Sequence, residues 1–147
     1  LICGIQGPPG AGISFGFSTV GLTMTASGEG AWMGNGLVEA IGPIGSVSPI
    51  VITTPKTGNL HNLYVNVVGD TLIPGSDLTL TIYRAVTGGV APVATAINAT
   101  ILAGTSSSNN TVVSIPVTSG ELLGIWISYT GLEPNPNLSI SAGFSID

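Results

Sequence analysis

The chain has 147 residues, of which 44% are hydrophobic and only 6% are charged. Lys56 and Arg84 are its two basic residues, and seven acidic residues bring the formal net charge to −5. Phosphate backbones and anionic bilayers both require clustered basic side chains, so this composition excludes nucleic acid and anionic membrane surfaces as partners. No run of about 18 apolar residues occurs, so we expect no membrane insertion.

The length is sufficient for one domain with a substantial hydrophobic core. Ordinary soluble domains have about a quarter of their residues charged. Here Ser, Thr, Asn and Gly take the place of most charged residues, and the mean hydropathy is +0.58. Such a surface suits a protein that buries much of its exterior against copies of itself, or one that carries sugars.

Residues 4–12 read GIQGPPGAG, in which glycine recurs at every third position as far as residue 10. Collagen requires this period because only glycine fits at the axis of the triple helix. The period is broken at Ile13. We therefore predict that residues 1–12 are the end of a collagen-like stalk or a linker and that residues 13–147 form a globular domain. The residues that carry the collagen-like pattern are Gly4, Gly7, Pro8, Pro9 and Gly10.

The same N-terminal segment holds Cys3, the only cysteine of the chain. A single cysteine excludes an intramolecular disulfide and a cysteine-rich metal site. A free thiol and a bridge between neighbouring chains are the two alternatives. No signal peptide is visible and the chain begins at Leu1, so we expect a fragment with further sequence upstream.

Beyond residue 12 the apolar residues recur with the period of two that predicts half-buried strands. The first of these strands begins at Ile13, and Phe15 and Phe17 follow at alternate positions. The glycine-rich residues 28–36 and the serine- and asparagine-rich residues 104–110 are predicted to be loops. Further strands are expected at 22–25, 37–41, 47–53, 60–67, 78–83, 93–101, 111–117, 122–129 and 138–146.

Helix formers such as Glu, Lys, Gln and Arg are scarce, whereas β-branched residues are abundant, which favours sheet. Turn signals recur about every ten residues between the predicted strands, as in β-sandwiches. We therefore predict an all-β fold of the sandwich or jelly-roll type. The apolar strand faces supply the candidates for core packing or for contacts between subunits, namely Phe15, Phe17, Leu80, Ile82, Trp126, Ile140 and Phe144.

The titratable residues form no recognisable catalytic set. Nucleophilic hydrolysis needs a base and an orienting group in contact with the nucleophile, and His61 is the only histidine. An outward-facing polar ring at a strand start accounts for it. Asp70 and Asp77 flank one turn, where they either contribute to a calcium site or are solvated carboxylates. We expect no enzyme activity, no metal and no cofactor.

Aromatic side chains near loops are the candidates for binding sugars. Trp32 in the glycine-rich segment and Tyr129 close to Gly131 are the two residues expected to contact a glycan. Three Asn-X-Ser/Thr sequons also occur, and either chance or glycosylation explains them in a chain so rich in these residues. The sequons begin at Asn98, Asn109 and Asn137.

From Gly58 onward the sequence reads GNLHNLYV, and a Pro-Gly-Ser turn then leads into LTLTIYR. A variable loop is followed by IPVTSGELLGI, and the last strand contains SAGFSI. This pattern resembles the C-terminal globular domain of bacterial collagen-like surface proteins, including exosporium glycoproteins of spore formers. Phage and virion collagen-like proteins have similar heads. The resemblance implies a jelly roll similar to tumour necrosis factor and the globular head of complement C1q, assembled as a homotrimer that sets the register of a stalk.

These observations together predict a non-catalytic surface module, the trimerising head of a collagen-like protein involved in surface coating or host attachment. Its expected location is extracellular, on a bacterial cell or spore surface. Its expected partners are other copies of the same chain and a host-surface or glycan receptor. The alternatives are a carbohydrate-binding module that uses loop aromatics such as Trp32, and a phage or virion structural head.

Overall fold

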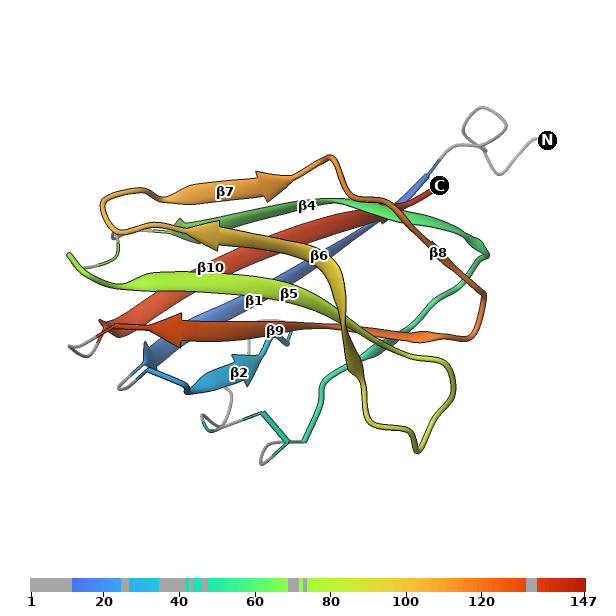
Figure 1. Cartoon of the computed structure of the whole chain (residues 1–147), viewed down its shortest axis with the longest axis horizontal. Helices are drawn as coiled ribbons and strands as arrows, with labels where there is room; N and C mark the ends of the chain where they lie inside the picture. Colours follow the sequence, from blue (N-terminus) through green and yellow to red (C-terminus); the bar gives the residue numbers. More distant parts are fainter. Residues whose placement is uncertain are drawn as a thin grey trace.

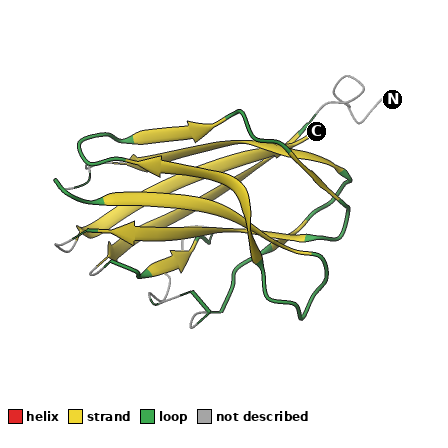
Figure 2. Ribbon diagram, in the orientation of Figure 1, coloured by secondary structure: helices red, strands yellow, loops and turns green. Residues whose placement is uncertain are grey.

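The computed structural model describes residues 12–24, 27–34, 42, 44–45, 48–68, 72, 74–131 and 135–147, and of residues 135–137 only the backbone. Several expectations fall outside these ranges: Cys3, the collagen-like residues up to position 11, Asp70 and the strand predicted at 37–41. The described residues form ten strands and no helix (Figure 2). They accordingly contain no helix of the length and apolar character that crossing a membrane requires.

The strands form two antiparallel sheets that face each other (Figure 1). The first sheet has the order β1 (Ile13–Met24), β10 (Asn135–Ile146), β4 (Gly58–Val68), β7 (Ser107–Asn110), with β8 (Ile115–Val117) also paired to β4. The second sheet has the order β2 (Gly30–Trp32), β9 (Leu122–Thr130), β5 (Asp77–Ala85), β6 (Val93–Ile101), with β3 (Ile52–Thr53) also paired to β9. The prediction of an all-β fold is therefore confirmed, with two layers as in a β-sandwich.

One apolar core lies between the sheets, because alternate side chains of each long strand point inward. On β5 the inward residues Leu78, Leu80 and Ile82 are each 0% exposed, and half-buried threonines separate them. β10 contributes Phe144, whose ring stacks on that of Phe17 from β1 at a centroid distance of 5.5 Å. The alternation seen in the sequence thus becomes the inner surface of both sheets.

A β-bulge in β4 explains why its buried residues depart from strict alternation. Leu60 and Leu63 are both 0% exposed although they are three residues apart. The pairing of β4 with β10 shifts register at this point, and Asn62 has a φ of 57°. Asparagine adopts this left-handed conformation more readily than most residues. The extra residue restores the alternation, so Val65 and Val67 again point into the core.

The loop predicted at 104–110 is wrong in its second half, because Ser107–Asn110 form β7 along the edge of β4. These residues carry no apolar alternation, so hydrophobic periodicity could not reveal the strand. The strand predicted at 111–117 is correspondingly shorter and is limited to β8. The predicted loop at 28–36 contains the short strand β2. Of the described residues 48–53 in the strand predicted at 47–53, only those of β3 pair in a sheet.

Two glycines of the second sheet make room for its tryptophans. Trp32 and Trp126 are paired across β2 and β9, and their rings meet edge to face at a centroid distance of 5.2 Å. A Cβ on Gly30 would overlap the Trp126 ring and the carbonyl oxygen of Ile127. A Cβ on Gly124 would lie 3.2 Å from the Cζ3 atom of Trp32. The absence of these two side chains lets the indole rings lie against the neighbouring backbone.

Gly30→Ala is therefore expected to lower the free energy of unfolding by about 1–3 kcal/mol, because the added methyl group overpacks the site. Gly88→Ala is the matched control, since a Cβ at Gly88 meets no atom within 4 Å. Its effect should stay within about 0.5 kcal/mol. Chemical denaturation of both variants measures the difference. Equal stabilities would contradict the close packing of Trp126 on Gly30.

Candidate functional site

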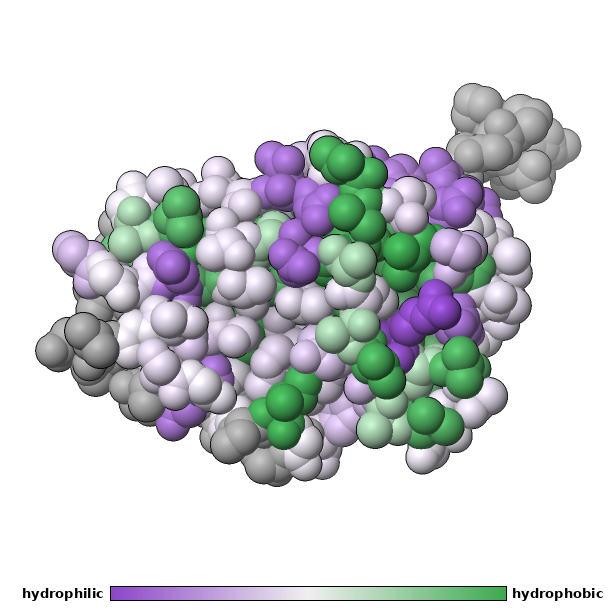
Figure 3. Space-filling view, viewed as in Figure 1, coloured by the Kyte–Doolittle hydropathy of each residue, from purple (hydrophilic) through white to green (hydrophobic). Residues whose placement is uncertain are grey.

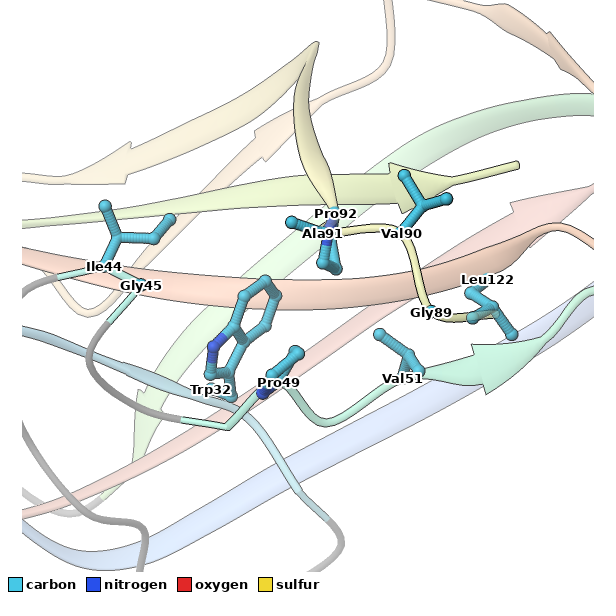
Figure 4. A pocket seen from close by; sticks show the side chains of 10 residues that line it. All are labelled: Trp32, Ile44, Gly45, Pro49, Val51, Gly89, Val90, Ala91, Pro92 and Leu122. Carbon is cyan, nitrogen blue, oxygen red and sulfur yellow. The ribbon is translucent and has the colours of Figure 1, made fainter. Parts of the chain in front are cut away.

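A hollow of about 500 Å³ lies on the side of the second sheet that faces away from the core. β2 and β9 supply Trp32 and Leu122, the segment before β3 passes along one side, and the β5–β6 hairpin closes the other (Figure 4). We call this hollow the Trp32 pocket. Its lining residues are Trp32, Ile44, Gly45, Pro49, Val51, Gly89, Val90, Ala91, Pro92 and Leu122.

Among the described residues, the side chains that line the Trp32 pocket are apolar apart from the indole N–H group, and backbone groups supply the polar part of its surface. Trp32 is only 3% exposed, whereas Ile44 and Val90 are 48% and 49% exposed. The pocket therefore has a covered aromatic wall and a mouth at which aliphatic side chains meet water. Its volume lies within the range of about 300–1,000 Å³ that is typical of small-molecule sites.

The structure places Trp32 differently from the expected glycan contact. It lies in β2 instead of a loop, and its ring meets those of Trp126 and Tyr83 edge to face, at centroid distances of 5.2 and 5.3 Å. Its Nε1 atom is buried and has no hydrogen-bond partner. A sugar stacks on an open aromatic face and hydrogen-bonds to polar neighbours. Trp32 offers neither.

Tyr129, the second expected glycan contact, is 0% exposed and belongs to the hydrophobic core. It follows Ile125 and Ile127 on the inward face of β9. The ring cannot contact a glycan from solution in this fold. The nearby Gly131 suggested a loop, but the alternation of β9 continues through Tyr129, and the tyrosine hydroxyl occupies the space where a side chain at Gly131 would lie.

The candidates for core or subunit contact separate into three groups. Five of them are buried in the core of a single chain, which leaves no surface for a neighbour: Phe17, Leu80, Ile82, Ile140 and Phe144. Phe15 is half-buried and lies 5.4 Å from the Phe144 ring between centroids. Trp126 is 5% exposed and packs beside Trp32, away from the core.

His61 contacts Asp147 at the end of the sandwich where β10 finishes. The distance from Nε2 to Oδ2 is 3.0 Å, so the two side chains form an ion pair whenever the imidazole is protonated. Nε2 lacks the alignment of a hydrogen bond. Ser145 lies opposite His61 across the strand pair, and its hydroxyl meets that of Ser14 at 3.3 Å. These contacts tie β1, β4 and the C-terminal end of β10 together.

No metal site is assembled in the part of the chain that the structure describes. Three or more His, Cys, Asp or Glu side chains never come together there in a way that could hold an ion. Asp77 begins β5, whereas Asp70 lies outside the described residues, so the calcium alternative at their turn stays a prediction.

The Trp32 pocket could not be predicted from the sequence, because its lining residues come from separate segments of the chain. The one local signal is residues 88–92, Gly-Gly-Val-Ala-Pro, where apolar residues directly follow a turn signal. Apolar side chains in a surface hairpin need a contact that hides them from water. That signal identifies one side of the pocket but not the side chains opposite.

Tyr83 lies beside Trp32, and burial raises the pKa of its phenol above the ordinary value of 10.0. The unfolded chain therefore ionises first as the pH rises, and stability falls as the pH passes above 10.0. The difference in phenolate absorbance between the protein and Tyr83→Phe should show a midpoint above 10.0 in the folded state. In denaturant the midpoint should return to the ordinary value. The same midpoint in both states would contradict the burial of Tyr83.

The described residues thus provide two packed sheets, a polar contact at one end and an apolar pocket on the second sheet. Comparisons with protein-family models, with curated proteins and with solved structures gave no match. A function for the chain must therefore be argued from its own residues and their arrangement.

Proposed function

We propose that the chain is the trimerising head of a collagen-like surface protein, with the strands wound as a jelly roll. In this role it holds three stalk chains in register and coats or attaches a bacterial cell or spore surface. The role is structural and includes no catalytic step.

The order of the strands supports the jelly roll. β2 and β3 both pair with β9, and β7 and β8 both pair with β4, so each couple occupies one strand position. The sheets then have the orders first–eighth–third–sixth and second–seventh–fourth–fifth. This interleaving of early and late strands is typical of a double-sheet jelly roll built from two Greek keys.

The way in which the collagen-like segment meets the head carries the proposal. A Cβ on Gly12 would lie 3.2 Å from the carbonyl oxygen of Ile146, and the next residue, Ile13, pairs with Ile146. β1 therefore begins at the end of the sandwich where β10 finishes (Figure 1). A stalk that enters there leaves both sheet faces free. Three heads packed side by side would hold three stalk ends together in parallel.

The outward face of the first sheet is a suitable surface for that packing. Its paired rows place Gly16 beside Gly143 and Tyr64, and Ser18 beside Ser141 and Asn66. We call this surface the serine face; its residues are Ser14, Gly16, Ser18, Tyr64, Asn66, Val68, Ser139, Ser141, Gly143 and Ser145. All of them are uncharged, and most are small; at one edge of this face, the row of Ser14 and Ser145 continues to His61, which contacts Asp147.

Two larger side chains of the serine face are exposed to solvent in the single chain. Tyr64 is 51% exposed and Val68 is 58% exposed. Small neighbours allow another backbone to approach closely, and burial of apolar area contributes about 25 cal/mol per Å². A three-fold arrangement that covers this face would account for a chain with so few charges.

The carbohydrate-binding alternative has less support than the structural role. Neither Trp32 nor Tyr129 presents an open ring, and no hydroxyl, amide or carboxyl side chain among the described lining residues of the Trp32 pocket could bind sugar hydroxyls.

A fusion tests the proposed role directly. A run of Gly-Pro-Pro triplets is placed before the 147-residue chain, and circular dichroism follows the melting of the triple helix. The head should raise the melting temperature and speed refolding, because it brings the three chains together. Tyr64→Lys in the fused head should remove this effect, since a trimer would bury three charges without partners.

Val112→Lys is the control for the fusion, because Val112 is 91% exposed and lies in the loop between β7 and β8. It should melt like the parent fusion. A triple helix that melts at the same temperature with and without the head would contradict the proposal. So would equal effects of Tyr64→Lys and Val112→Lys.

A further inference from the structure

We propose that the Trp32 pocket binds a small, neutral, apolar molecule, such as the end of an aliphatic chain or an unsubstituted ring. This inference goes beyond the structural role, which requires no ligand. It also concerns the other sheet, since the pocket lies on the second sheet and the serine face on the first.

The chemistry of the pocket identifies the class of molecule. Pro49, Val51, Pro92 and Leu122 offer only hydrocarbon, and the two glycines of the lining offer no side chain. In the described part of the lining, the single polar side-chain atom is Nε1 of Trp32, whose surface is covered and which has no partner there. A ligand therefore gains contact mainly with the aliphatic groups, since little of the ring is uncovered, and gains no hydrogen bond to a side chain of the described lining. A polar ligand would lose hydration that only backbone groups of the lining could replace.

The charges near the pocket also favour a neutral ligand. The residues of the lining that the structure describes include none with a charge. Arg84 lies on the neighbouring strand β5, and its Nη1 donates a hydrogen bond to the carbonyl oxygen of Pro116 at 2.9 Å, which links the second sheet to β8 of the first. The lining thus offers no cation for an anionic head group, and the protein as a whole is negatively charged. A neutral ligand is the one that this environment accepts.

The shape of the pocket favours a small molecule over a second protein surface. Trp32 is nearly covered, while Ile44 and Val90 remain about half exposed and come from different segments. The pocket is therefore a recess with aliphatic residues at its mouth. At the lower right of Figure 3, where Figure 1 places the β5–β6 hairpin, the hydrophobic residues form separate small groups and not one broad patch. A flat partner would leave the recess unfilled.

Titration with the neutral dye Nile red tests the proposal. The protein should bind the dye saturably, with the blue-shifted emission of an apolar environment and one site per chain. Val90→Asp should weaken binding by about tenfold or more, because it places a charge at the mouth. Ala91→Trp should abolish binding by filling the recess without adding charge. Val112→Asp is the control and should bind like the parent.

The outcomes separate the candidate occupants. Absence of saturable binding, or equal binding by the Val90, Ala91 and Val112 variants with unchanged thermal melting, would overturn the proposal. If Val90→Asp lowered the mass of the assembly and the parent did not bind the dye, the recess would be a contact between chains and the proposal would be wrong. Failure of dye binding would leave the triple-helix experiment unaffected, so the two proposals can fail separately.

Discussion

A single apolar core lies between the two sheets and holds them together. It is formed by inward-facing side chains of β4 and β10 in one sheet and of β5 and β9 in the other. Every other feature of the fold depends on this contact. Only 6% of the residues are charged, so ion pairs can contribute little to the stability of the fold. The ion pair between His61 and Asp147 is partly exposed and lies at one end of the sandwich, where such a pair contributes little. The free energy of folding must come from apolar burial and from the backbone pairing of the strands.

Strands with a half-buried pattern could be predicted closely from the sequence. The predicted ranges 78–83, 122–129 and 138–146 lie within β5, β9 and β10, because a face toward the core imposes a period of two. β7 could not be predicted in this way. Its Ser and Asn side chains are exposed or half-buried and show no apolar alternation. The strand forms because β4 offers an unpaired edge. Asn110 then donates to the carbonyl oxygen of Asn98 at 3.0 Å, which joins β7 to the second sheet.

The candidate site was harder to predict for the same physical reason. Glycine near Trp32 indicated a loop, but Gly30 is required because the Trp126 ring occupies the space of its side chain. The glycine is thus a packing feature inside a sheet. Tyr129 was expected near a loop but is buried in the core. A buried aromatic residue at the end of a strand can have the same local sequence as an exposed one at the start of a loop. Which aromatic residue borders a cavity is decided by contacts between distant segments.

The proposed roles use three separate regions of the surface. We propose that one end of the sandwich joins the collagen-like segment and that the serine face of the first sheet packs on other chains. The Trp32 pocket lies on the second sheet. Assembly through the serine face is the central claim. Sedimentation equilibrium of the 147-residue chain at micromolar concentration tests it most directly. We expect a single species of three times 14.6 kDa, and a species of 14.6 kDa across that range would contradict trimer assembly.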